Sequence, residues 1–209
     1  RTIDEEDWAD SWKEHFYPQK IGRHIVVKPT WRDYQDGPDD MVIEIDPGMA
    51  FGTGTHATTR MCLIMIERHL RRGMSFLDVG TGSGILLIAA HLLGAGRVAG
   101  VDNDPVAVEI AAANILLNRL PANRAGVFLS DLVADVTGSF DLVCANIITE
   151  GVVDLIPDIK KVLSPHGLFL CSGIIESRRS LVEERLQRVG FQIIDLLKKH
   201  PGISPFPLW

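Results

Sequence analysis

The stretch FLDVGTGSGIL, residues 76–86, decides the fold. It begins with a short apolar run typical of a buried strand, continues through three alternating glycines, and opens a helical pattern at Gly84. Glycine lets the backbone approach a ligand closely, and the first turn of a helix offers free N–H groups. The stretch therefore predicts a strand, a ligand-holding turn and a helix, with a purely structural turn as the alternative.

The glycine spacing and a carboxylate indicate which ligand the turn holds. The glycines follow G-x-G-x-G, whereas the dinucleotide fingerprint is G-x-G-x-x-G. Asp78 lies just before the turn, where it would repel a pyrophosphate but suit the ammonium of an amino-acid moiety, directly or through water. This combination favours S-adenosylmethionine over a nicotinamide dinucleotide.

A second segment, GVDNDPVAV at residues 100–108, ends the next strand pattern. Asp102 follows the glycine turn by about 20 residues, the position from which an acid binds the ribose hydroxyls of an adenosine ligand. The alternative is that Asp102 only caps the next helix. We expect Asp104 to be that cap, because Pro105 suits the first helical turn.

Two more segments carry polar groups suited to a site. The loop AFGTGTHATTR, residues 50–60, is too long and too polar for a plain connector, so we expect it to cover a ligand. The alternative is that Thr58 or Thr59 merely caps the helix that follows. Asn146 ends a buried strand pattern, where its amide oxygen could orient an amine, and the alternative role is again a helix cap.

Strand and helix patterns alternate along the chain, which predicts an α/β fold with a mainly parallel sheet and helices on both faces. The expected strands are 25–28, 41–45, 75–79, 97–101, 127–129, 140–145, 168–172 and 191–197. The expected helices are 4–16, 84–93, 105–117, 152–163 and 178–189.

Composition limits the possible partners. With 209 residues and a net charge of −6, the chain suits one domain and lacks the basic balance of nucleic-acid-binding proteins. No apolar run is long enough to span a bilayer, so we expect a cytoplasmic protein, and we expect a monomer. Cys62, Cys144 and Cys171 have no metal-ligand spacing, which predicts buried free thiols and no metal. Acidic residues gather within 33–46, as solvated surface charge or as an attraction for a cationic substrate.

Together the segments resemble the ribosomal protein L-eleven methyltransferase (PrmA) family. The resemblance rests on DPGMAFGTGTHATTR (46–60), LDVGTGSGIL (77–86), GVDNDPVAV (100–108) and ANI (145–147), and DWADSWKEHFYP (7–18) is similar to the family's linker. It implies the Rossmann-like class I methyltransferase fold, with a seven-stranded, mainly parallel sheet, and S-adenosyl-L-methionine as cofactor.

The resemblance also implies site residues. Asn146 is expected to be catalytic by orienting an amine, and Asp131 matches the acid on the adenine side. The expected cofactor-binding residues are Phe51, Thr53, Gly54, Thr59, Asp78, Gly80, Thr81, Gly82, Asp102, Asn103, Asp131 and Asn146.

The family methylates lysine ε-amines and an N-terminal α-amine of a large-subunit ribosomal protein, which it recognises through a small N-terminal domain. We therefore expect residues 1–35 to be a linker helix with the segment leading into a catalytic domain at 36–209. Because the chain starts at Arg1, we expect a fragment without the recognition domain.

Ile148-Thr149-Glu150 departs from the family pattern, in which leucine and small residues usually follow. This departure leaves open a methyltransferase acting on another protein or on a small amine. A non-catalytic S-adenosylmethionine-binding module is the alternative of a different class, and the glycine spacing disfavours a nicotinamide-dependent oxidoreductase.

Overall fold

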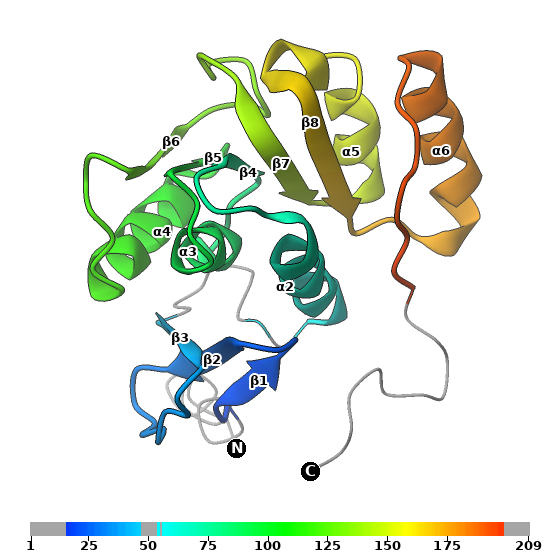
Figure 1. Ribbon diagram of the computed structural model, residues 1–209. Helices are drawn as coiled ribbons and strands as arrows, with labels where there is room; N and C mark the ends of the chain where they lie inside the picture. The colour runs from blue at the N-terminus through cyan, green and yellow to red at the C-terminus, as the bar shows by residue number, and fades with distance from the viewer. Residues whose placement is uncertain (1–15, 47–53, 55, 199–209) are drawn as a thin grey trace, which may run out of the picture.

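The computed structural model describes residues 16–46, 54 and 56–198 (Figure 1). Its strands are β1 Gln19–Ile21, β2 Ile25–Pro29, β3 Met41–Ile45, β4 Ser75–Val79, β5 Arg97–Asp102, β6 Ala125–Leu129, β7 Phe140–Asn146 and β8 Leu163–Ser172. Its helices are α2 Ala57–His69, α3 Ile85–Leu92, α4 Pro105–Leu117, α5 Thr149–Leu155 and α6 Arg179–Arg188, with 3-10 turns η1 Ile159–Lys161 and η2 Glu176–Arg178.

The larger sheet has the order β6-β5-β4-β7-β8, and every neighbouring pair of strands in it is parallel. The chain moves outward from β4 to β6 and then returns to place β7 on the other side of β4. The strand order therefore reverses at β4, and open α/β sheets bind ligands at the carboxyl ends of the strands beside such a reversal.

Alternating side chains of the sheet face two separate cores. Phe76 and Leu142 face a core shared with α2, α3 and the smaller sheet of β1, β2 and β3, whereas Leu77 and Val143 face a core shared with α5. Figure 1 shows the smaller sheet beneath α2 and α3. The Rossmann-like class with helices on both faces is confirmed, and the described residues contribute five strands to the sheet.

The free edge of β3 is bonded by side chains rather than by another strand. Asn118 accepts from the Glu44 N–H at 2.9 Å and donates to the Glu44 carbonyl at 2.7 Å. Asn114 accepts from the Asp46 N–H at 3.0 Å and donates to the Asp46 carbonyl at 3.2 Å. Because i and i+4 residues share a helix face, the two amides of α4 occupy the places of a neighbouring strand.

Two predicted elements differ from the structure. The helix predicted at 152–163 ends at Leu155 with Pro157 two residues beyond, and a separate 3-10 turn follows. The strand predicted at 191–197 is wrong, because this segment forms no strand. Instead the Asp195 carboxylate accepts hydrogen bonds from Arg68 at 2.7 Å and from His69 at 2.8 Å, both at the end of α2.

The other predicted strands and helices within the described residues match observed elements, with small differences at their ends. Asp104 caps α4 by accepting from the Val106 N–H at 2.9 Å, as expected. The predicted helix at 4–16 lies almost wholly outside the described residues, and the division of the chain at residue 35 stays a prediction. No helix in the described ranges is long and apolar enough to cross a membrane.

Replacing Asn114 with alanine should lower the free energy of unfolding by about 2–4 kcal/mol, because buried backbone groups lose their partners. Urea denaturation measures this loss. Asn123→Ala, in an exposed loop, is the control and should change stability by less than about 0.5 kcal/mol. Equal effects of the two substitutions would contradict the role of Asn114.

Candidate active site at the carboxyl ends of the strands

The carboxyl ends of β4, β5 and β7 bring three of the predicted segments together. The glycine turn follows β4, Asp102 ends β5, and Asn146 ends β7. β4 lies between β5 and β7, so the turn stands between the carboxylate and the amide. The sequence separates these groups widely, and the parallel sheet assembles them at one edge.

The glycine turn is bonded to β5 and lies against the residue after β7. The N–H groups of Gly80 and Thr81 both donate to the Val101 carbonyl at 2.9 Å. Gly80 has φ +71°, and a Cβ there would lie 2.3 Å from Cγ2 of Ile147. The left-handed conformation and this close approach explain why glycine is needed at this position.

Asp102 is held by the backbone on both sides. One carboxylate oxygen accepts from the Gly82 N–H at 2.9 Å, and the other accepts from the Asp104 N–H at 3.1 Å. A carboxylate has about four lone-pair positions, so Asp102 keeps acceptor capacity for a ligand. Nearby, Asn103 and Asp131 are exposed, and Asp131 follows directly on Ser130, whose N–H donates to the Asp102 carbonyl at 2.9 Å.

Asn146 contacts the predicted loop at residues 50–60, called here the threonine loop. Its side-chain amide donates to the Thr59 hydroxyl at 3.3 Å, and Thr59 is buried in the first turn of α2. Asn146 is not a helix cap, because the N-cap of α5 is Ile148. Neither Thr58 nor Thr59 caps α2 either, since that role belongs to the His56 ring, which accepts from the Thr58 N–H at 3.3 Å.

The threonine loop is described only in part. Phe51 and Thr53 lie outside the described residues. Gly54 is described with φ +82°, and a Cβ there would lie 3.1 Å from side-chain atoms of Ile85 and Val27. Gly54 of the loop therefore packs against Ile85, the first residue of α3, which directly follows the glycine turn.

Asp78 lies beneath the glycine turn rather than at its surface. The carboxyl group is fully buried and accepts from the Thr81 hydroxyl at 2.9 Å, while its second oxygen has no partner among the described residues. Burial raises the pKa of Asp78 to about 7, and the charge of Asp102 adds to the shift, whereas the Thr81 hydrogen bond opposes it.

Asn114 links the glycine turn to Asp46, directly after the last strand of the smaller sheet. Besides bonding Asp46, it donates to the Ser83 carbonyl at 2.9 Å. The sequence did not identify this residue as part of the site. The signal was a pair of asparagines four residues apart, Asn114 within a mostly apolar helix and Asn118 at its C-cap.

Thr149 is a second residue whose role the sequence did not reveal. Its buried hydroxyl donates to the Gly173 carbonyl at 3.3 Å and accepts from the Ile175 N–H at 3.2 Å. These bonds join the start of α5 to the segment after β8. Beside them the side chains of Ile148 and Ile175 are 71% and 58% exposed, which gives this side of the site two exposed apolar side chains.

The cysteines do not supply a nucleophile. Cys62 and Cys144 are buried free thiols as predicted, while Cys171 is half-buried. The pKa of Cys144 is raised well above its usual value by its hydrogen bond with Cys62 and by burial, and burial raises the pKa of Cys171 to about 12. Thiolates are the reactive form, so the raised pKa values make Cys144 and Cys171 unreactive at neutral pH.

Comparison with known proteins identifies the family. The model of "Ribosomal protein L11 methyltransferase (PrmA)" matches residues 1–201. The chain belongs to this family. It is 57% identical to the ribosomal protein L11 methyltransferase of Desulfosudis oleivorans, over 92% of this chain and 64% of that protein. It is 48% identical to that of Caldanaerobacter subterraneus, over 97% of this chain and 64% of that protein.

Solved structures support the same assignment. The crystal structure of ribosomal protein L11 methylase from Lactobacillus delbrueckii subsp. bulgaricus superposes with a TM-score of 0.83 at 37% identity, covering 88% of this chain and 94% of that chain. A methyltransferase from Pyrococcus furiosus shares the fold alone, with a TM-score of 0.58 at 22% identity, over 66% of this chain and 75% of that chain. The chain spans slightly less than two thirds of the length of the curated relatives that it matches.

The buried Asp78 carboxyl should make stability depend on pH. Its folded pKa of about 7 lies above its usual 3.8, so its stabilising contribution is complete below pH 3.8 and is lost as pH rises towards 7. Relative to wild type, Asp78→Asn should gain about 1.4 kcal/mol per pH unit between roughly pH 4 and pH 7. Urea denaturation at several pH values measures the difference, and parallel stability curves would contradict the shift.

Thr149→Val should lower the free energy of unfolding by about 1–2 kcal/mol, because the Ile175 N–H loses its acceptor. Amide hydrogen exchange at Ile175 should also become faster. Thr149→Ser keeps the hydroxyl and is the matched control, expected to retain wild-type exchange at Ile175. Slow exchange in the valine variant would show that the bond is dispensable.

Proposed function

We propose that this chain is the catalytic part of an S-adenosyl-L-methionine-dependent protein N-methyltransferase. Its proposed substrate is a large-subunit ribosomal protein, methylated on lysine ε-amines, on the N-terminal α-amine or on both. The observation that carries the proposal is the pairing of Asn146 with Thr59 beside the glycine turn. Family membership supports the substrate, and we propose the cytoplasm as the place of action.

The donor and acceptor groups fit the proposed cofactor. Asp102 retains acceptor positions for ribose hydroxyls after its two backbone bonds, and the glycine turn gives backbone access beside it. Asp131 is exposed at the end of β6, on the side proposed for adenine. When bound, the cofactor supplies a methyl group already activated on a sulfonium, so the protein has mainly to position the acceptor.

Asn146 is proposed to orient the substrate amine. Its N–H side is occupied by the Thr59 hydroxyl, which leaves its carbonyl oxygen to accept a hydrogen bond from the amine. That bond would direct the nitrogen lone pair away from Asn146. Thr59 is buried and set in a helix, so it fixes the orientation of the amide.

The amine must lose its proton before it accepts a methyl group. For a lysine with a pKa near 10.4, the neutral form costs about 4 kcal/mol at pH 7.4. An apolar setting lowers this cost by disfavouring the charged form. Ile147 lies next to Asn146, and the exposed Ile148 and Ile175 could contact the methylenes of a lysine stem, so no strong general base is required.

Two of the six acidic residues at 33–46 form ion pairs within the chain, whereas Asp33, Asp36 and Asp39 are exposed. Asp40 pairs with Lys20 at 2.6 Å, and Glu44 pairs with Lys28 at 2.7 Å. The hydrogen bond from Lys20, with those from Tyr34 and Gly37, lowers the pKa of Asp40 to about 2. Carboxylates engaged in this way hold the loop together and offer little charge to a partner.

Asn146→Ala should reduce methyl transfer at least 100-fold while leaving the affinity for S-adenosylhomocysteine within about threefold, because the amine loses its acceptor. The assay incubates the chain with the ribosomal protein and cofactor and counts methyl groups by intact mass, with and without the upstream sequence of the full-length enzyme. Full activity of Asn146→Ala with normal binding would refute its role.

Asp102→Asn should instead weaken S-adenosylhomocysteine binding about tenfold or more, because hydrogen bonds accepted by a carboxylate are stronger than those accepted by a neutral amide. Calorimetric titration measures this affinity, and Asn123→Ala serves as the control. A panel of small amines and other proteins separates the alternatives. Binding without transfer to any acceptor, even by the full-length enzyme, would favour a non-catalytic binding module.

A further inference from the structure

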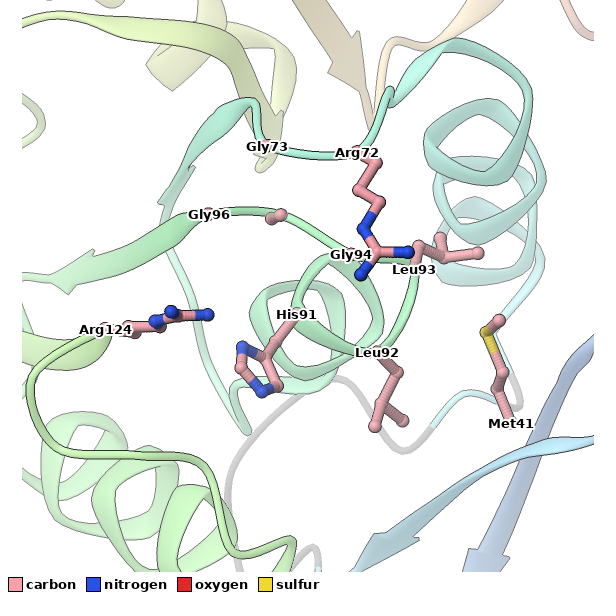
Figure 2. A pocket seen from close by; sticks show the side chains of 10 residues that line it. Met41, Arg72, Gly73, His91, Leu92, Leu93, Gly94, Gly96 and Arg124 are labelled. Carbon is pink, nitrogen blue, oxygen red and sulfur yellow. The ribbon is translucent and has the colours of Figure 1, made fainter.

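A pocket lies at the edge of the sheet opposite the candidate active site, beside the amino ends of β4, β5 and β6 (Figure 2). Its volume is about 530 Å³, within the range of small-molecule sites. The basic residues Arg72, His91 and Arg124 line it together with the apolar residues Met41, Leu92 and Leu93. The proposed methyltransferase function uses none of these side chains.

Backbone hydrogen bonds fix the loops that form this pocket. The Gly73 N–H donates to the Gly94 carbonyl and the Gly96 N–H to the Met74 carbonyl, both at 2.8 Å. The Val98 N–H donates to the Arg124 carbonyl at 2.7 Å. Because these amides are already bonded, a ligand would be held by the side chains.

The C-terminus of α3 forms one wall of the pocket. Gly94 has φ +98° and donates to the His91 carbonyl at 2.9 Å, and the Ala95 N–H donates to the Ala90 carbonyl at 3.0 Å. This arrangement is a Schellman motif, which satisfies the last carbonyls of the helix. The wall is therefore a closed helix end.

The polar side of the pocket is cationic. No acidic residue lines it, and within the described ranges neither Arg72 nor Arg124 forms an ion pair. The Nδ1 atom of His91 is buried and has no partner among the described residues. Burial, with a contribution from the charge of Arg124, lowers the pKa of His91, so the ring is neutral at pH 7 and offers one donor.

We propose that this pocket binds a small organic phosphate monoester. The charges of the two guanidinium groups match the double negative charge of a phosphate, each group can donate to phosphate oxygens, and His91 adds a third hydrogen-bonding group. Figure 2 shows Arg124 and His91 on one side, Met41 on the other and Arg72 between them beside Leu93, so the organic body of the ligand would face the apolar residues. The ligand would lie at the opposite end of α3 from the glycine turn.

A competing explanation assigns the arginines a structural role. Cationic side chains near a helix C-terminus interact favourably with its partial negative charge. Arg72 does pack over Gly94, since a Cβ at that glycine would lie 3.3 Å from Cγ of Arg72. The same partial charge disfavours an anion there, so binding depends on both arginines.

Titration with phenyl phosphate tests the proposal, using calorimetry for affinity and amide chemical shifts for location. Wild type should bind saturably, with shifts at Gly73, Gly94 and Gly96. Arg72→Gln and Arg124→Gln should each weaken binding about tenfold or more, because each removes a charge-assisted hydrogen bond. Arg185→Gln, on the exposed face of α6, changes the net charge equally and should leave binding within about twofold.

Three further measurements complete the test: the affinity for benzoate, the affinity for inorganic phosphate and the melting temperature of each variant. Weaker binding of benzoate supports the phosphate head, and weaker binding of inorganic phosphate supports contact with the apolar wall. The proposal fails if phenyl phosphate does not bind saturably, if Arg185→Gln weakens binding as much as the pocket variants, or if benzoate binds more tightly. It also fails if the arginine substitutions lower only the melting temperature, which would leave the helix-end role alone.

Discussion

One buried amide, that of Asn114, bonds two parts of the molecule that lie far apart in the sequence, the end of the smaller sheet and the glycine turn. It bonds both backbone groups of Asp46 at the end of the smaller sheet and the Ser83 carbonyl in the glycine turn. A buried carbonyl or N–H without a partner costs about 1–3 kcal/mol, so the amide couples the position of the smaller sheet to that of the turn.

The glycine turn lies between the polar groups of the candidate site and is held on both sides. Its amides bond the Val101 carbonyl, and Gly80 leaves no room for a side chain beside Ile147, so the turn is fixed between β5 and β7. That placement sets a carboxylate, Asp102, on one side and an amide, Asn146, on the other. The two groups differ in their supports, because backbone N–H groups hold Asp102 whereas a threonine hydroxyl holds Asn146. The proposed roles of Asp102 in cofactor binding and of Asn146 in amine orientation should therefore be separable by mutation.

The sequence predicted those parts of the fold that depend on local chemistry. The strand, turn and helix at 75–92 and the Asp104 cap follow from glycine spacing and capping preferences. Interactions distant in sequence were not predictable in this way. The segment 191–197 has the composition of a strand, but Asp195 is bonded to Arg68 and His69 far away in the chain. Thr149 looked only like a departure from the family pattern, because its partners Gly173 and Ile175 lie beyond the next strand.

Charge divides the two edges of the sheet. Asp102 and Asp131 lie at or just after the carboxyl ends of β5 and β6, whereas Arg72 and Arg124 lie just before the amino ends of β4 and β6. Asp141, at the amino end of β7, is engaged by the backbone and hydroxyl of Ser75. The proposed sulfonium cofactor and lysine substrate would both carry positive charge, so the acidic edge would favour them and the basic edge would repel them. An anion has the opposite preference. Helix α3 joins the two edges over about 12 Å, so oppositely charged ligands could occupy its two ends without competing.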